Sequence, residues 1–156
     1  MVTYEELLIE ADNENLKVYD DYELTGNLKG LYYNGSIAIR KDLTVREKKC
    51  VLAEEIGHYK TTYGDILDQR NVHNRKRERK GKIYAYDRLI GMDGLIECYH
   101  ECVSSTYEMT EVLDVTEEFL NEALAYYTGK YGTGVDHEEY YIQFIPYLTV
   151  IRRIDE

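Results

Sequence analysis

Two carboxylates and an imidazole lie close together in residues 44–63, which read TVREKKCVLAEEIGHYKTTY. Glu54 and His58 are four residues apart, so on an α-helix they lie on one side, one turn from each other. Carboxylate and imidazole are both ligands of divalent metal ions in proteins. The spacing therefore predicts that Glu54 and His58 can hold one ion, with the carboxylate of Glu55 beside it.

The string Glu54-Glu55-Ile56-Gly57-His58 differs at one position from the H-E-x-x-H pattern of zinc peptidases. In that pattern the two His side chains bind the metal, and the Glu takes a proton from the bound water. Here Glu54 has the first ligand position, Glu55 the position of the general base, and His58 that of the second ligand. The residues alone leave another interpretation open, in which the three form only a polar edge of a solvated helix.

A helix has to carry this motif, and the sequence contains its start signal. Thr44 followed by Glu47 has the form of a capping box. The apolar residues that follow recur at helical spacing and predict one buried stripe: Val51, Leu52, Ile56 and Tyr59. Glu54 and His58 would then lie along the edge of that stripe.

A small sheet is predicted just before this helix. Residues 30–39, GLYYNGSIAI, are two β-rich runs around an Asn-Gly pair suited to a type I′ turn. A second capping box, Thr3 with Glu6, predicts a helix that ends near residues 12–15, and residues 16–24 are typical of a short strand. The hairpin can either offer an edge strand to an extended peptide or simply pack on the helix; both interpretations stay open.

A basic helix is predicted over residues 75–90, RKRERKGKIYAYDRLI, after a polar loop over residues 65–74. Its acidic residue, Glu78, is either a solvated charge or an inward-facing third ligand; the residues alone favour the solvated charge, because helix charges usually face water. The basic cluster is likewise expected to be a solvated face. Further helices are predicted over 95–103, over 107–113 and from Thr116, followed by an edge strand or extended arm over 140–151.

Charge is distributed unevenly along the chain. Residues 1–90 contain 16 Lys and Arg against 16 Asp and Glu, whereas residues 91–156 contain 3 against 14, which is the whole net charge of −11. Phosphate repulsion argues against nucleic acid as a partner of the acidic part. Such a surface can instead attract a basic protein.

The 156 residues suit a single domain, and no apolar run approaches the roughly 18 residues of a membrane span. The first residues do not have the pattern of a secretory signal, so we expect a cytoplasmic protein. The three cysteines, Cys50, Cys98 and Cys102, are expected to be buried or free thiols.

Several of these segments together resemble the ImmA/IrrE family of metallopeptidases, in the form carried by phages and mobile elements. The segments are VLAEEIGHY, the following TTYGDILD, and Glu78-x-x-Gly81-x-x-Tyr84-Ala85, which is like the family's E-x-x-A-x-x-[FW]-A. The strand pair and the closing YYIQFIPYLTV are also similar to the phage forms, so the resemblance covers nearly the whole chain.

The resemblance implies an α+β zincin fold over residues 1–156, mostly helical, with a small antiparallel sheet beside the active-site helix. It implies zinc as cofactor, His58 and Glu78 as ligands with Glu54 in the first ligand position, and Glu55 as general base. The activity implied is an endopeptidase that cleaves a helix-turn-helix repressor of a phage or mobile element inside a bacterial cell.

The carboxylate of Glu54 in the first ligand position changes the chemistry of the site. A more anionic, oxygen-rich ligand set weakens the Lewis acid and shifts preference from zinc towards manganese. It also motivates an alternative function, in which the protein is a catalytically inactive zincin scaffold, with or without metal, that binds and sequesters a repressor or other regulatory protein.

Overall fold

The motif of Glu54, Glu55 and His58 lies on helix α2 (Val45–Thr61) in a computed structural model that describes residues 1–61 and 71–154, without the side chains of 71–75. The chain divides into two compact units. One is Val2–Leu89, which contains all the residues of the predicted site, and the other is Ile90–Glu156 together with Met1. Each unit is described separately.

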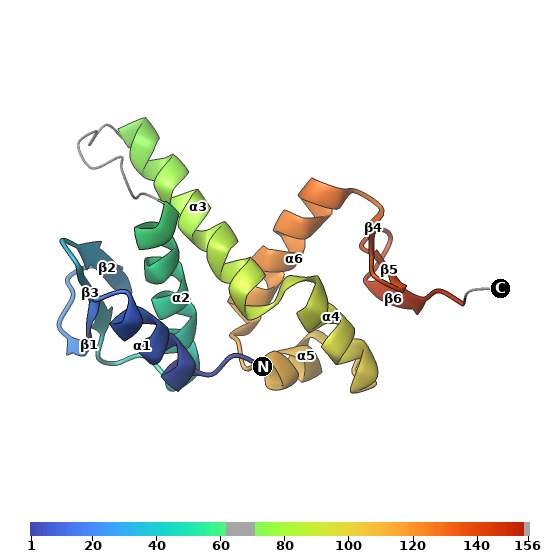
Figure 1. The fold of residues 1–156 in the computed structure, drawn as a ribbon, viewed down its shortest axis with the longest axis horizontal. Helices are drawn as coiled ribbons and strands as arrows, with labels where there is room; N and C mark the ends of the chain where they lie inside the picture. The colour runs from blue at the N-terminus through green and yellow to red at the C-terminus, as the bar shows by residue number, and fades with distance from the viewer. Residues whose placement is uncertain (62–70, 155–156) are drawn as a thin grey trace. The chain divides into compact units, whose positions relative to one another are not determined.

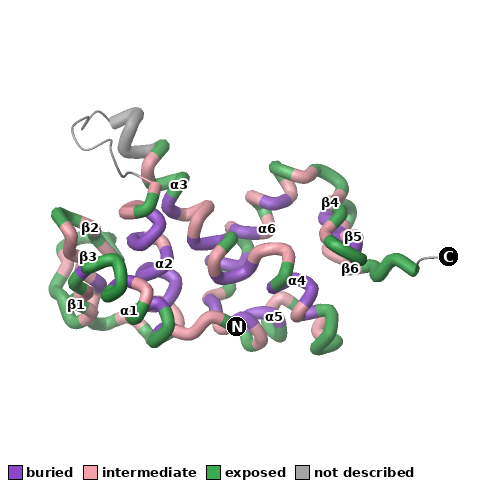
Figure 2. The backbone as a smooth tube through the Cα atoms, viewed as in Figure 1, coloured by how far each residue is buried: buried purple, intermediate pink, exposed green. Residues whose placement is uncertain are grey.

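Helix α2 begins with the predicted capping box. The amide of Glu47 donates to Oγ1 of Thr44 at 3.1 Å, and the amide of Thr44 donates to the carboxylate of Glu47 at 3.2 Å. Three of the four residues of the predicted stripe, Val51, Leu52 and Ile56, are buried. The burial extends beyond that stripe because α2 packs against α1, α3 and the sheet, as Figure 2 shows by the purple colour of its middle turns.

The hairpin before α2 is confirmed as β2 (Gly30–Tyr33) and β3 (Ser36–Arg40), which pair antiparallel. Asn34 and Gly35 have φ values of 48° and 80°, both in the left-handed region that a type I′ turn requires. The sheet also contains the predicted strand before the hairpin, β1 (Lys17–Tyr22), which pairs with β3 in parallel.

The strand order β1-β3-β2 makes this sheet mixed, whereas we expected antiparallel pairing. The reason is the path of the chain, which leaves β1, enters β2 at the far edge, and returns between the two as β3. Strands β1 and β2 are therefore both edges. The side chains of Ile37 and Ile39 on the central strand are fully buried.

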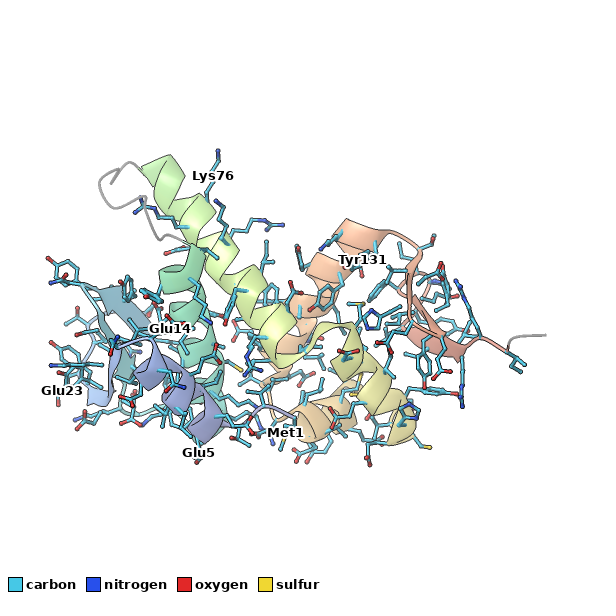
Figure 3. The ribbon with its side chains drawn as sticks, in the orientation of Figure 1. Met1, Glu5, Glu14, Glu23, Lys76 and Tyr131 are labelled. Atoms are coloured by element: carbon cyan, nitrogen blue, oxygen red, sulfur yellow. The ribbon has the colours of Figure 1, made fainter. Side chains whose placement is uncertain are left out.

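Helices α1 (Tyr4–Asn13) and α3 (Asn71–Leu89) complete this unit, and α3 lies alongside α2 (Figure 1). The predicted loop over 65–74 falls partly outside the described residues, and its last part, 71–74, is helical. Polar composition does not separate a loop from the first turn of a helix, so the predicted helix start at residue 75 is wrong and α3 begins at Asn71. The basic cluster is solvated as expected: Lys76, labelled in Figure 3, and Arg79 and Lys80 are exposed.

A polar network centred on Glu10 joins α1 to α2 and α3. Its carboxylate accepts from Nζ of Lys60 at 3.0 Å and from the hydroxyl of Tyr84 at 2.9 Å. Arg88 adds a contact through Nε at 3.2 Å. Only 20% of the Glu10 side chain is exposed. This single carboxylate therefore connects the three helices on the side of α2 that carries Lys60.

The second unit contains α4 (Gly91–His100), α5 (Thr106–Leu113) and α6 (Glu117–Tyr131). Its sheet consists of β4 (Gly134–His137), β5 (Tyr140–Gln143) and β6 (Thr149–Arg152), in that order and antiparallel. The predicted helix after Thr116 is confirmed. Its cap is a hydrogen bond of 3.1 Å from the amide of Phe119 to Oγ1 of Thr116. The tail was expected to give one edge strand or an arm; it forms two strands, of which β5 lies between β4 and β6.

The structure confirms the expected α+β class with much helix and small sheets. The prediction of a single domain over residues 1–156 stays a prediction. Cys50 and Cys98 are buried and Cys102 is exposed, and none of these three residues forms a disulfide. Among the described residues, no helix combines the length and the apolar character needed to cross a membrane.

Candidate metal centre

The three motif residues differ in burial along α2. Glu55 has 6% of its surface exposed, while Glu54 and His58 are half-buried at the edge. The backbone of Gly30 on strand β2 covers Glu55: a Cβ placed on Gly30 would lie 3.1 Å from Oε1 of Glu55 and 2.4 Å from Cγ1 of Val51. The sequence did not predict that Glu55 would be buried beneath the edge strand.

The carboxylate of Glu55 and the imidazole of His58 lie in contact. Oε2 of Glu55 is 3.2 Å from Nδ1 of His58, an ion-pair distance, although the geometry is not that of a well-directed hydrogen bond. This buried oxygen makes no hydrogen bond within the described part of the chain. A carboxylate has several acceptor sites, so Glu55 keeps the capacity to accept a proton from a water molecule.

The other edge of the imidazole lies against α3. A Cβ placed on Gly81 would be 1.9 Å from Cδ2 and 2.6 Å from Nε2 of His58, which is closer than atoms can approach. Gly57 and Gly81 also bring the two backbones together, since a Cβ on Gly57 would lie 2.5 Å from the carbonyl oxygen of Gly81. The ring therefore occupies space that exists because position 81 has no side chain.

Negative charge surrounds His58. Burial alone would lower its pKa, because it disfavours the imidazolium. The contact with Glu55 and the charges of Glu55, Glu54 and Glu78 outweigh this effect, so the pKa of His58 lies above its ordinary value. A cation at this position would therefore meet favourable electrostatics, and it would compete with protons for the ring of His58.

Glu78 lies on α3, one turn before Gly81, and its side chain is exposed. Its charge acts on His58, which agrees with a position near the ring. Even so, Glu54, His58 and Glu78 do not form one of the sets of described residues whose ligand atoms all lie within 4.8 Å of one another. Among the described residues, one set meets that spacing, and it belongs to the second unit: Asp93, His137 and Glu138. Two of those three side chains are exposed, and the sequence did not single them out.

The donors around His58 fit a divalent ion in their chemistry. They offer an imidazole nitrogen and carboxylate oxygens, which zinc and manganese both accept. The Gly81 position forms a cradle for the ring, and Glu55 has a buried oxygen without a hydrogen bond. Glu54 and Glu78 would supply the remaining oxygens. The predicted ligand set stays a prediction, supported by this arrangement.

A family model for the IrrE N-terminal-like domain, peptidase M78, matches residues 7–125. The chain belongs to this family. The resemblance to ImmA/IrrE metallopeptidases that we saw in the motifs is thereby confirmed. Comparison with curated proteins and comparison with solved structures gave no significant match.

Membership of this peptidase M78 family supports a metallopeptidase, and so a hydrolase, of the ImmA/IrrE type. The matched region includes all of α2 and α3 and ends within α6. The strands β4, β5 and β6 lie beyond it. The family match does not test the roles of Glu54, Glu55, His58 and Glu78 in this chain.

Two glycines belong to the site although the sequence analysis gave them no role. Gly30 was named only as part of the hairpin, and Gly81 only as part of the pattern that resembles the family. A glycine inside a helix, where it costs about 1 kcal/mol relative to Ala, is a signal of close packing that could have drawn attention to Gly81. Which side chain would lie against it could not be read from the sequence.

Proposed function

We propose that this protein is a metal-dependent endopeptidase that cleaves a helix-turn-helix repressor of a phage or mobile element in the bacterial cytoplasm. One observation carries the proposal: Glu55 is buried next to His58 and has a carboxylate oxygen without a hydrogen bond. A buried carboxylate without a well-directed partner is costly. A role as the base that takes a proton from water would explain why a carboxylate is buried at this position.

In this mechanism His58, Glu54 and Glu78 would hold the metal, zinc by expectation and manganese as the second choice. A bound divalent ion supplies Lewis acidity for the scissile carbonyl and makes water more acidic. Glu55 accepts the proton of the attacking water and delivers it to the leaving amine. The contact with Nδ1 of His58 restrains the Glu55 carboxylate while leaving its other lone pairs available.

The edge strand β2 is the proposed binding place of a peptide substrate. Among the residues that the structure describes, β2 pairs with β3 alone, which leaves its other side for strand addition. Gly30 of this strand directly covers Glu55. An extended peptide paired along β2 would therefore run beside the proposed base. The repressor as the source of that peptide is proposed from the family resemblance.

The decisive experiment compares Glu55→Gln with wild type on the repressor encoded next to the gene. Glutamine keeps the shape of the side chain but removes the base, so we expect cleavage to fall by about 100-fold or more while zinc binding persists. Glu5→Gln, at an exposed position on α1, is the matched control and should cleave normally. Full cleavage by the Glu55 variant would refute the mechanism.

A non-catalytic scaffold is the second candidate. Two observations favour it: Glu54 stands in the first ligand position, and Glu54, His58 and Glu78 do not form one of the sets of described residues whose ligand atoms all lie within 4.8 Å of one another. In this case the protein sequesters the repressor without cutting it. Purified protein without bound zinc or manganese, which still binds the repressor intact, would favour the scaffold.

The variant Glu54→His separates the two candidates further. It restores the H-E-x-x-H pattern, and imidazole in place of carboxylate leaves more positive charge on the metal. If catalysis is limited by the ligand set, zinc affinity and cleavage should both rise. A variant that binds zinc tightly but cleaves nothing would indicate a scaffold.

A further inference from the structure

The imidazole of His58 occupies a space on α3 that a side chain at position 81 would fill. We call this space the Gly81 notch. A Cβ on Gly81 would lie 1.9 Å from Cδ2 and 2.6 Å from Nε2 of the ring. Separations below 3.0 Å essentially never occur for a real Cβ. The ring in its present position and any side chain at position 81 therefore exclude each other.

The helices leave little room for adjustment at this point. The carbonyl oxygen of Glu54 would be 3.0 Å from a Cβ on Gly81, and a Cβ on Gly57 would be 2.9 Å from Cβ of Tyr84. Backbone and side-chain stems, which cannot rotate away, thus surround the crossing. A methyl group at position 81 could be accommodated only by moving the ring or by separating α2 from α3.

The notch also determines where the two nitrogens of the ring point. With the Cδ2–Nε2 edge against Gly81, Nδ1 lies 3.2 Å from Oε2 of Glu55. The Nε2 edge consequently faces α3, the helix that carries Glu78 one turn earlier. One ring position thus sets the contact with the proposed base and places the second nitrogen beside α3, the helix that carries the proposed third ligand.

We propose that Gly81 is a positioning residue, whose missing side chain fixes the His58 ring between Glu55 and α3. Its effect on metal affinity rests on the proposed function, whereas its effect on the ring does not. Gly81→Ala adds only the atom that would occupy the notch. Gly129→Ala on α6 is the matched control, because a Cβ there meets nothing within 4 Å.

The position of the ring is tested directly by NMR. In wild type we expect nuclear Overhauser contacts between Hδ2 of His58 and Hα of Gly81. In Gly81→Ala these contacts should be lost or strongly weakened, and the ring signals of His58 should shift; Gly129→Ala should leave both unchanged. Absence of the contacts in folded wild-type protein, or their persistence in Gly81→Ala, would overturn the proposal.

Thermal unfolding shows whether the His58 ring causes the loss of stability that we expect in Gly81→Ala. Ala is a better helix former than Gly, so Gly129→Ala should leave Tm unchanged or raise it. Gly81→Ala should instead lower Tm by several degrees, and in a His58→Ala background most of that loss should disappear. An equal loss in both backgrounds would assign the penalty to the backbone crossing and reject the role of the ring.

Zinc titration by calorimetry links the notch to the metal. Partners that orient a ligating His are typically worth 10- to 100-fold in metal affinity, so Gly81→Ala should weaken zinc binding by about that factor relative to wild type and Gly129→Ala. Unchanged affinity in Gly81→Ala would reject the positioning role in metal binding. Wild type that binds neither zinc nor manganese would refute the proposed peptidase, and the NMR contacts and the Tm comparison would still decide the role of Gly81.

Discussion

Replacing Glu10 by Ala should destabilise the protein by about 2–3 kcal/mol at pH 7. The carboxylate accepts from Tyr84 at 2.9 Å, and a hydrogen bond to a charged acceptor contributes about 1.5 kcal/mol or more. Lys60 and Arg88 have about a third of their side chains exposed, so each ion pair adds only about 0.5 kcal/mol. These contributions together give the expected range.

The same contribution should depend on pH with a definite sign. Burial alone would raise the pKa of Glu10, but the hydrogen bonds from Lys60 and Tyr84 and the charge of Arg88 outweigh it and lower the pKa. A lowered folded-state pKa means that the stabilisation is fully present above the ordinary value of 4.5 and is lost as the pH falls through the folded-state value.

Urea unfolding of wild type and Glu10→Ala at pH 7, and again below pH 4.5, measures both effects. Glu14→Gln, at the C-cap of the same helix, is the matched control because the contacts of Glu14 are long, 3.9 Å to Lys60 and 3.5 Å to the hydroxyl of Tyr59. It should change the unfolding free energy by less than about 0.5 kcal/mol. The reasoning fails if Glu10→Ala is equally mild at pH 7, or if its cost is the same at both pH values.

Three further changes test other parts of the structure. Burial and the charge of a neighbouring carboxylate raise the pKa of Cys98 to about 11, so iodoacetamide at pH 8 should label the exposed Cys102 and spare Cys98 in folded protein, as read by peptide mass spectrometry. Gly35→Ala should cost about 1 kcal/mol in urea unfolding because φ is 80° there, whereas Gly129→Ala should be neutral or stabilising; equal effects would contradict the turn assignment. Leu120→Ala removes a fully buried side chain and should cost about 2–5 kcal/mol in the same assay, and a cost near zero would show that α6 is packed differently.

The sequence alone was sufficient for features that depend on neighbours along the chain. The capping boxes at Thr3 and Thr44 and the Asn34-Gly35 turn involve residues at most three positions apart. Their hydrogen bonds and backbone angles are local, so the pattern of residue types is enough to predict them. The pairing of Glu54 with His58 on one side of a helix followed from the same kind of reasoning.

The surroundings of that motif depended on which surfaces meet in the folded chain. Gly30 over Glu55, Gly81 against the His58 ring and Glu10 bonded to two other helices all join residues more than 20 positions apart. The parallel pairing of β1 with β3 likewise follows from the path of the chain. Helical periodicity shows which face of a helix is apolar, but it does not specify the neighbour that covers it. Tertiary packing therefore decided that Glu55 is buried, that His58 lies between two helices, and that a glycine rather than a polar residue sets the position of its ring.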